Sequence, residues 1–240
     1  MSLRLGILGG TFDPIHVGHL QAARDVADAL GLDRIVFIPN ASPPHKDTTA
    51  VEPAARLAPA EERFGWVEAS IAGDDRFEAS RCEIDREGPS YLIDTLAELT
   101  GGDAAGFVFI VGQDAFREMG EWRAPRELLA ACSWAVCTRP PLLEGHLGDW
   151  LPEVARDDFE VAEDGRSARH RTAGTWIRLV EITPVDISAS ELRVLLSTGG
   201  GADRWLPEPI RDAVRESGCY TPGPASALAP PRPAAQETPR

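Results

Sequence analysis

Short apolar runs alternate with longer amphipathic stretches along most of this chain. Runs rich in Ile, Val and Phe predict β-strands over residues 3–8, 34–38, 106–111, 134–138 and 176–182. Apolar positions at helical spacing predict helices over residues 18–30 and 60–71. Because strands that alternate with helices form βαβ units, the pattern predicts an α/β fold. We expect a Rossmann-like, doubly wound parallel sheet with helices on both faces.

Capping residues predict three further helices. Ser90 can cap one helix, and Ser190 can cap a later one. Pro207 can open a last helix that Gly218 ends. We therefore expect a single domain over residues 1–220 with a small C-terminal helical part.

Two stretches do not follow the alternating pattern. Residues 145–173 are charged and lack apolar periodicity, which predicts a loop-rich insertion. Residues 221–240 contain six prolines with Ala and Ser between them, which predicts a disordered, Pro-rich tail. Neither stretch is expected to contribute to the sheet.

The composition narrows the classes of protein that need to be considered. Apolar residues make up 43% of the 240 residues, enough to bury a sizeable core. The chain has 24 basic and 38 acidic residues, whereas a nucleic-acid binder needs a basic excess. Apolar runs fall well short of the roughly 18 residues of a membrane span, and glycines come too early for a signal peptide. We expect a cytoplasmic protein without nucleic-acid or membrane partners.

The number and spacing of the cysteines also indicate the cytoplasm. Cys82, Cys132, Cys137 and Cys219 are far apart, without a C-x-x-C pair or metal-ligand spacing. Two of them, Cys132 and Cys137, accompany an apolar strand-like run and are expected to be small buried hydrophobes. This usage is typical of a reduced protein.

The first predicted strand runs into an unusual loop, GGTFDPIHVGH, which begins at Gly9. It is neither a Walker A loop nor a G-x-G-x-x-G motif. Paired glycines let the backbone approach a ligand closely, and a helix that begins near His16 directs free N–H groups to the same place. His16 and His19 are three residues apart, so they lie on one face of the first turn.

Three interpretations of this histidine pair are open. Two ordinary surface histidines are the commonest explanation of H-x-x-H in general. A zinc site needs a third protein ligand, and the nearby sequence does not offer one. A helix start carries about half a positive charge, which disfavours protonated imidazoles unless an anion is present. We therefore favour a polyphosphate bound between His16 and His19.

Five segments together carry a family resemblance. GGTFDPIHVGHL resembles the signature of nucleotidyltransferases that have a Rossmann-like sheet and an H-x-G-H motif. It is followed in order by PNASPPHK, REGPSYLIDT, FIVGQD with Trp122 shortly after, and ISASELR. The set resembles bacterial nicotinate-nucleotide adenylyltransferases over residues 3–220. This resemblance implies that ATP and nicotinate mononucleotide react to give deamido-NAD and pyrophosphate in NAD biosynthesis.

The resemblance also implies where the two substrates bind. The catalytic residues would be His16, His19 and Arg193. The ATP site would further include Gly9, Gly10, Thr11, Gly112, Asp114, Ser188 and Ser190. The nicotinate-mononucleotide site would comprise His45, Lys46, Ser90, Tyr91, Leu92, Trp122 and Arg139. Mg²⁺ would be held mainly by substrate phosphates, without a protein metal site.

The segment around Ser90 bears on which pyridine nucleotide binds. Pro89-Ser90-Tyr91 places N–H groups at a helix start, which suits the carboxylate of nicotinate, and Trp122 would stack on the pyridine. The acid is therefore expected to be preferred over its amide. Leu92 stands where the family usually has Thr, so a backbone N–H is kept and any hydroxyl contact is lost.

Other interpretations remain open at this stage. Taken alone, S-x-x-R is more often a capped helix, Lys46 a solvated loop lysine and Trp122 a packed indole. Another adenylyl or cytidylyl transferase of the same fold, such as one that acts on phosphopantetheine, would share the first motif. A nucleotide-binding sensor without catalysis is a further alternative. The sequence also leaves a homo-oligomeric state open.

Overall fold

The computed structural model describes residues 3–42, 57–102, 104, 106–138 and 146–221. All the strands and helices predicted from the apolar pattern fall within these ranges. The predicted Pro-rich tail lies outside the described residues except for its first residue, Thr221. His45, Lys46 and Arg139 also lie outside them.

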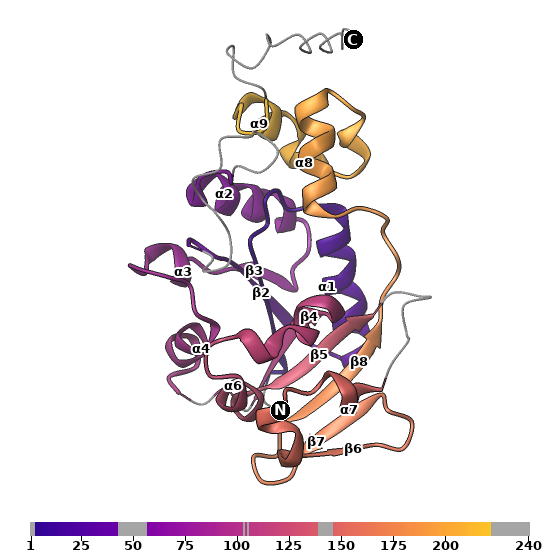
Figure 1. Ribbon diagram of the computed structural model, residues 1–240. Helices are drawn as coiled ribbons and strands as arrows, with labels where there is room; N and C mark the ends of the chain where they lie inside the picture. Colours follow the sequence, from indigo (N-terminus) through magenta and orange to yellow (C-terminus); the bar gives the residue numbers. More distant parts are fainter. Residues whose placement is uncertain (1–2, 43–56, 103, 105, 139–145, 222–240) are drawn as a thin grey trace, which may run out of the picture.

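One eight-stranded sheet forms the centre of the molecule, in the order β3-β2-β1-β4-β5-β8-β7-β6 (Figure 1). The parallel strands are β1 (Leu5–Gly10), β2 (Arg34–Pro39), β3 (Phe77–Ala79), β4 (Phe107–Gly112), β5 (Ser133–Thr138) and β8 (Trp176–Glu181). The chain moves outward from β1 through β2 and β3, then returns to the other side of β1 as β4. The strand order therefore reverses between β1 and β4, as the doubly wound prediction requires.

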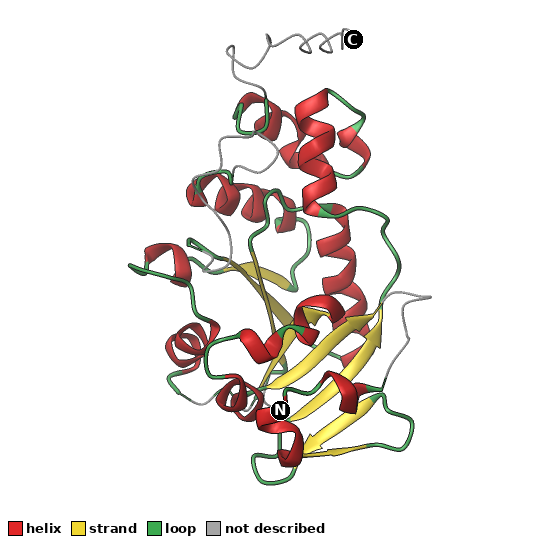
Figure 2. Cartoon of the chain, viewed as in Figure 1, coloured by secondary structure: helices red, strands yellow, loops and turns green. Residues whose placement is uncertain are grey.

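Helices occupy both sides of this sheet (Figure 2). The α-helices are α1 (Val17–Leu30), α2 (Ala60–Ile71), α3 (Cys82–Asp85), α4 (Leu92–Thr100), α5 (Gln113–Arg117), α6 (Pro125–Ala131), α7 (Leu147–Trp150), α8 (Ala189–Thr198) and α9 (Arg211–Glu216). The 3₁₀ turns are η1 (Met119–Glu121), η2 (Glu153–Asp158), η3 (Ala202–Arg204) and η4 (Glu208–Ile210).

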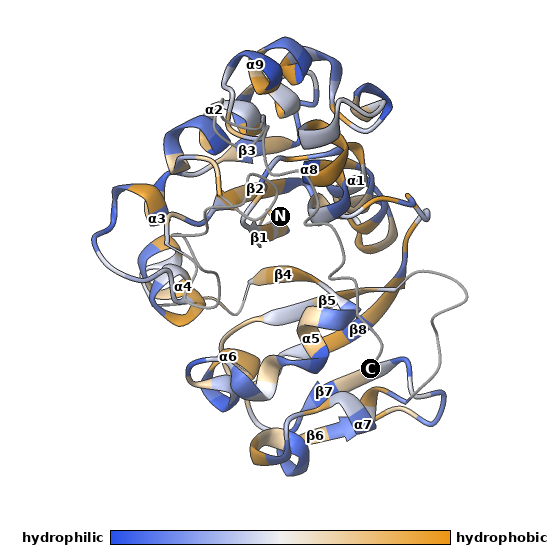
Figure 3. Ribbon diagram, turned by 45° about the horizontal axis from the view of Figure 1, so that its top comes forward, coloured by the Kyte–Doolittle hydropathy of each residue, from blue (hydrophilic) through white to orange (hydrophobic). Residues whose placement is uncertain are grey.

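The core has two halves because neighbouring residues of a central strand point to opposite faces. In β4, Val108 and Ile110 join the core that α1 and α2 cover. The alternate residues Phe109 and Val111 join the core under α4 and α6. Strands buried on both faces are apolar along nearly their whole length. Figure 3 shows this for β4 and for β2, whose first residue, Arg34, is the exposed exception. This continuous apolarity is what made the central strands predictable.

Helix α8 begins two residues earlier than predicted. Its N-cap is Ser188 rather than Ser190: the Glu191 N–H donates to Ser188 Oγ at 3.2 Å. In return, the Ser188 N–H donates to the Glu191 carboxylate at 2.8 Å. This reciprocal capping box requires an acidic residue three positions after the serine, and only Ser188 has that spacing to Glu191. The predicted cap at Ser190 is therefore wrong.

The region expected to be a loop-rich insertion contains regular structure. Its described part holds α7, η2 and two strands, β6 (Phe159–Val161) and β7 (Ser167–His170). Strand β7 pairs antiparallel with β8, and β6 pairs antiparallel with β7, so the sheet is mixed rather than wholly parallel. These strands are only three and four residues long. The edge of β8 supplies hydrogen bonds to β7, and β7 supplies them to β6, so the local apolar pattern has little to reveal.

Two expectations about compartment can be compared with the structure. No described helix is long and apolar enough to cross a membrane. All four cysteines are free, and Cys132 and Cys137 are buried as predicted. Burial raises the pKa of the Cys132 thiol to about 12, so this side chain is a neutral hydrophobe near neutral pH.

Candidate active site between β1 and β4

A cavity of about 630 Å³ lies where the strand order reverses, at the carboxyl ends of β1 and β4. Open α/β sheets bind ligands at this position because the loops after the two strands diverge there. It brings together twelve of the residues proposed from the sequence: Gly9, Gly10, Thr11, His16, His19, Ser90, Tyr91, Leu92, Gly112, Asp114, Trp122 and Ser188.

Two glycines, in β1 and α1, stand where a Cβ would be tightly packed. A Cβ on Gly9 would lie 3.2 Å from the Phe109 ring, so the loop packs directly on β4. A Cβ on Gly18 would lie 3.0 Å from His16 Nδ1. The imidazole of His16 therefore lies against the bare backbone of the first helical turn. The close approach of the paired glycines to a ligand stays a prediction.

The two histidines lie together at the start of α1. Their ring centroids are 3.7 Å apart with 28° between the planes, and His16 is only 5% exposed. The His16 N–H donates to His19 Nδ1 at 3.2 Å. Because Nδ1 of His19 accepts, the proton of the neutral ring lies on Nε2, which is then a donor. The geometry thus assigns a tautomer that could donate to an anion.

One of the helix-start N–H groups expected to face a ligand is used differently. Val17 N–H donates to the carbonyl oxygen of Trp205 at 2.9 Å. This bond ties the start of α1 to the segment between η3 and η4. The prediction of free N–H groups at this helix start is therefore wrong for Val17.

The buried carboxylate of Asp13 anchors the loop after β1 to residues outside that loop. Asp13 is fully buried and accepts hydrogen bonds from the Tyr220 hydroxyl at 2.6 Å and from the Ala58 N–H at 3.0 Å. Burial, with the nearby charge of Asp13, raises the pKa of the Tyr220 hydroxyl. Tyr220 is therefore a neutral donor over the ordinary pH range.

Arg63 fixes the neighbouring backbone. Its guanidinium donates to the carbonyl oxygens of Thr11 at 2.6 Å, Ala58 at 2.9 Å and Ala41 at 3.3 Å. Burial lowers the pKa of Arg63, which still leaves this guanidinium charged. One side chain from α2 thus ties the loop after β1 to both described ends of the connection between β2 and α2.

Arg193, expected at the triphosphate, is bonded to the first loop. Its Nη1 donates to the Asp13 carbonyl oxygen at 3.0 Å and lies 3.6 Å from Asp13 Oδ2. Its Nη2 donates to Ser190 Oγ at 3.1 Å. The cavity lining includes neither Arg193 nor Ser190. Their direct contact with substrate stays a prediction.

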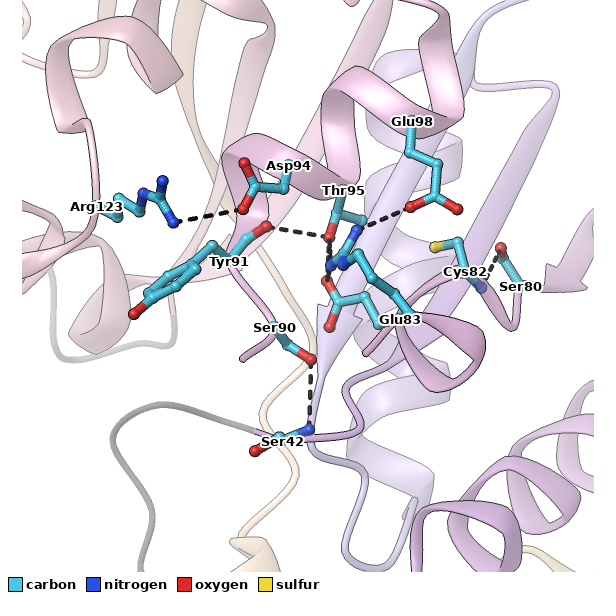
Figure 4. A network of polar contacts seen from close by, with 11 residues as sticks. Ser42, Ser80, Cys82, Glu83, Ser90, Tyr91, Asp94, Thr95, Glu98 and Arg123 are labelled. Carbon is cyan, nitrogen blue, oxygen red and sulfur yellow. Dashed lines mark hydrogen bonds and ion pairs between the residues drawn. The ribbon is translucent and has the colours of Figure 1, made fainter. Parts of the chain in front are cut away.

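The opposite end of the cavity is formed by the start of α4 and by Trp122. The N-cap of α4 is Tyr91 rather than Ser90, so the predicted cap is displaced by one residue. Ser90 Oγ instead accepts from the Ser42 N–H at 3.4 Å, which joins α4 to the loop after β2 (Figure 4). Trp122 is half-buried, with its ring edge-on to Trp134 at 6.3 Å between centroids. It presents an indole to the cavity from a packed position.

A polar network fixes α3 against α4 (Figure 4). The Thr95 hydroxyl donates to Glu83 Oε1 at 2.6 Å and accepts from Arg86 Nη2 at 2.7 Å. Arg86 Nη1 also donates to Glu98 at 2.9 Å. Because every member of this chain has a partner, the helix start that borders the cavity is held in one position.

Sequence reasoning missed several residues of this site. Asn40, Glu83, Gln113 and Arg123 also line the cavity. Glu83 precedes Arg86 by three residues, a spacing that places both on one helix face and offered a signal. Asn40 and Gln113 belong to the segments PNASPPHK and FIVGQD, which marked them as candidates. Arg123 had no signal, because its position depends on which loops meet at the strand ends. Within the described ranges, no group of three His, Cys, Asp or Glu side chains is placed to hold a metal ion.

Fold and site together define a nucleotidyltransferase, and the comparison with known families agrees. Residues 7–195 match the family described as cytidylyltransferase-like, and the chain belongs to it. Among the solved structures, a nicotinic acid mononucleotide adenylyltransferase of Plasmodium falciparum, complexed with NaAD, has the same fold. Its TM-score is 0.63 at 15% identity, over 91% of this chain and 98% of that one.

Closer relatives narrow the group. The "Probable nicotinate-nucleotide adenylyltransferase" of Trichlorobacter lovleyi is 38% identical over 221 residues, which cover 92% of this chain and all of the relative. The protein of the same name from Halorhodospira halophila is 39% identical over 220 residues, covering 90% of this chain and 94% of the relative. Within its class, the chain belongs to the nicotinate-nucleotide adenylyltransferase family, as the five sequence segments predicted.

Proposed function

We propose that this chain transfers the adenylyl group of ATP to nicotinate mononucleotide, forming deamido-NAD and pyrophosphate in NAD biosynthesis. The observation that carries the proposal is one cavity that joins two different ends. The paired imidazoles of His16 and His19 lie at the first end, and the start of α4 with Trp122 lies at the second. The names of the relatives in this family support the same reaction.

The triphosphate would bind at the first end. Gly9, Gly10 and Thr11 would bring backbone close to the phosphates, and His19 Nε2 would donate to them. Arg193 would act from behind the loop, where its guanidinium already contacts Asp13. The α8 cap residue Ser188 lines the same cavity, and Ser190 would hold Arg193 in place.

The mononucleotide would bind across the second end. The N–H groups of Tyr91 and Leu92 would receive the pyridine carboxylate, whereas the Ser90 N–H, predicted to join them, already donates to the Ser42 carbonyl oxygen at 3.0 Å. The Trp122 indole would stack on the ring. Gly112, the last residue of β4, and Asp114, in the first turn of α5, would contact ribose. The mononucleotide phosphate is assigned to His45, Lys46 and Arg139, which lie outside the described residues.

The reaction needs positioning more than proton transfer. A phosphomonoester is largely ionised at pH 7 because its second pKa is about 6, so its oxygen can attack the α-phosphorus of ATP without a general base. A new P–O bond forms at that phosphorus while the bond to the β-phosphate oxygen breaks, and pyrophosphate leaves. The site would lower the barrier by aligning two polyanions and by donating to the departing charge. His16, His19 and Arg193 would serve this purpose.

Mg²⁺ would accompany ATP in this site. The ion takes oxygen ligands and usually keeps several of its waters. Asp114, an exposed carboxylate on the cavity lining, is an oxygen donor of the required kind. One carboxylate together with phosphates and water fits such an ion, which would neutralise phosphate charge when bound. We expect EDTA to abolish pyrophosphate release and added Mg²⁺ to restore it.

A substrate panel tests the proposed function. The purified full chain is incubated with Mg-ATP and, separately, nicotinate mononucleotide, its amide, phosphopantetheine or FMN. We expect dinucleotide and an equal amount of pyrophosphate with the acid, at the highest kcat/KM of the four. Preferential adenylylation of phosphopantetheine or FMN, or no pyrophosphate release with the acid, would overturn the proposal.

A further inference from the structure

Arg123 places a guanidinium at the end of the cavity where α4 begins. It directly follows Trp122, and both residues line the cavity. Its Cζ atom is 4.6 Å from the centroid of the Tyr91 ring, and its Nη1 is 3.6 Å from Asp94 Oδ2. In Figure 4 the Arg123 side chain is directed toward Asp94, with Tyr91 beside it. The cation is therefore held over the residue that caps α4.

The charges on the cavity wall make this position important. Among the described lining residues, Arg123 is the only arginine or lysine, whereas Glu83, Asp114 and Glu118 contribute carboxylates. A substrate carboxylate entering the cavity meets these like charges, and a neutral amide does not. Leu92, at the start of α4, adds no polar side chain. Among the described lining residues, Arg123 is thus the basic side chain that can favour binding of the substrate carboxylate over the neutral amide.

Asp94 and Tyr91 hold Arg123 in place but leave its guanidinium able to bind another anion. The side chains of Arg123 and Asp94 are 56% and 47% exposed, so solvent screens the ion pair and a competing carboxylate can replace Asp94. Stacking on Tyr91 keeps the guanidinium oriented during such an exchange. The next residue, Ala124, has φ 55° and ψ 55°, a left-handed conformation that a non-glycine residue keeps only where its surroundings enforce it. The chain direction at Arg123 is therefore imposed by the fold.

We propose that Arg123 is a specificity-determining residue that exchanges Asp94 for the carboxylate of the pyridine substrate and so selects the acid over the amide. The inference rests on the proposed function, because it concerns the second substrate of that reaction. It adds a charged side chain to a recognition otherwise assigned to backbone N–H groups and to stacking.

The test compares Arg123→Gln, Arg123→Lys and the control Arg117→Gln. Arg117 is exposed on α5, 5.8 Å from the centroid of the Trp150 ring and outside the cavity lining. The Arg117→Gln substitution therefore removes the same charge as Arg123→Gln at a position that does not contact substrate. For each protein, kcat and KM are measured with nicotinate mononucleotide, with its amide and with ATP. The ratio of kcat/KM for acid over amide is the readout.

We expect Arg123→Gln to lower this ratio about tenfold or more through KM for the acid, because a charge-assisted hydrogen bond is lost. KM for ATP should stay within twofold, Arg123→Lys should keep part of the ratio, and Arg117→Gln should keep all of it. An unchanged ratio in Arg123→Gln, or an equal loss in Arg117→Gln, overturns the inference and leaves the proposed function standing. A wild-type enzyme that forms no dinucleotide from either mononucleotide overturns both.

Discussion

The hydroxyl of Tyr220 donates a 2.6 Å hydrogen bond to the carboxylate of Asp13, a residue 207 positions earlier in the chain. Both side chains are almost completely buried, and Tyr220 also packs 6.0 Å from the Trp66 ring. Asp13 belongs to the loop that follows β1, and Tyr220 is among the last residues that the structure describes. The C-terminal helical part therefore supports the loop that borders the candidate active site.

Tyr220→Phe should destabilise the fold by about 1–3 kcal/mol, because a buried carboxylate oxygen loses a donor. Urea unfolding at pH 7 measures the free energy of unfolding. Tyr91→Phe is the control for stability, since Tyr91 is only half-buried at the cavity rim, and it should change the free energy by less than about 0.5 kcal/mol. Equal stability of Tyr220→Phe and wild type would show that this bond contributes nothing.

The buried thiol of Cys132 makes a prediction about alkaline stability. Burial raises its pKa from 9.0 to about 12, so above pH 9 the unfolded chain loses this proton before the native one does. The contribution is fully present below pH 9 and is lost as the pH rises from 9 to 12, by up to about 1.4 kcal/mol per pH unit. The destabilisation caused by Cys132→Ala should therefore shrink between pH 9 and 11.

The free energy of unfolding at pH 8, 9, 10 and 11 checks this for wild type, Cys132→Ala and Cys219→Ala. Cys219, which is only partly buried near the C-terminal end, serves as the cysteine control. A constant difference between wild type and Cys132→Ala over the whole range would contradict the prediction.

Two helical glycines provide a matched pair. A Cβ on Gly18 would lie 3.0 Å from His16 Nδ1, whereas a Cβ on Gly65 in α2 would meet nothing within 4 Å. Gly65→Ala should stabilise the fold by about 0.5–1 kcal/mol through helix propensity and leave activity intact. Gly18→Ala should instead lower kcat about tenfold or more, because it displaces the His16 imidazole, which we propose binds phosphate. Steady-state kinetics and thermal unfolding of the two variants separate these effects. Equal kcat values would show that the position of the His16 imidazole does not affect turnover.

His19→Ala should lower kcat by about 10² or more while the thermal unfolding curve stays cooperative, by analogy with the removal of one transition-state donor. His146→Ala, at an exposed histidine that starts α7, is the matched control and should keep wild-type turnover. The rate of adenylyl transfer is measured as the rate of pyrophosphate release. Near-normal turnover in His19→Ala would exclude this histidine from the chemistry.

Trp122→Ala should raise KM for nicotinate mononucleotide about tenfold and KM for ATP much less, because a stacking surface contributes about 1–3 kcal/mol. Trp122→Phe keeps an aromatic face and should recover most of the loss. For each variant, the KM for ATP serves as the internal control for the KM of nicotinate mononucleotide. Parallel increases of the two KM values would show that the indole supports the fold and does not stack on the pyridine.

The apolar pattern and the short motifs were enough to predict the central strands and the first loop of the candidate site. The central strands were predictable to within about two residues because they are buried on both faces and remain apolar whichever neighbours they have. The G-G-T loop with His16 and His19 was predictable because its geometry depends on bare backbone and on spacing within one helical turn. Together these features sufficed for the fold class and the family.

The remaining features depend on contacts between distant segments, which no local pattern records. Short strands such as β7 and β6 form because β7 pairs with the edge of β8 and β6 pairs in turn with β7. The Tyr220–Asp13 bond and the stacking of Arg123 on Tyr91 exist because packed helices bring those residues together. Spacing along a chain determines what lies on one strand or one helical turn; only the tertiary structure decides which turns meet, and so which charges face the substrate.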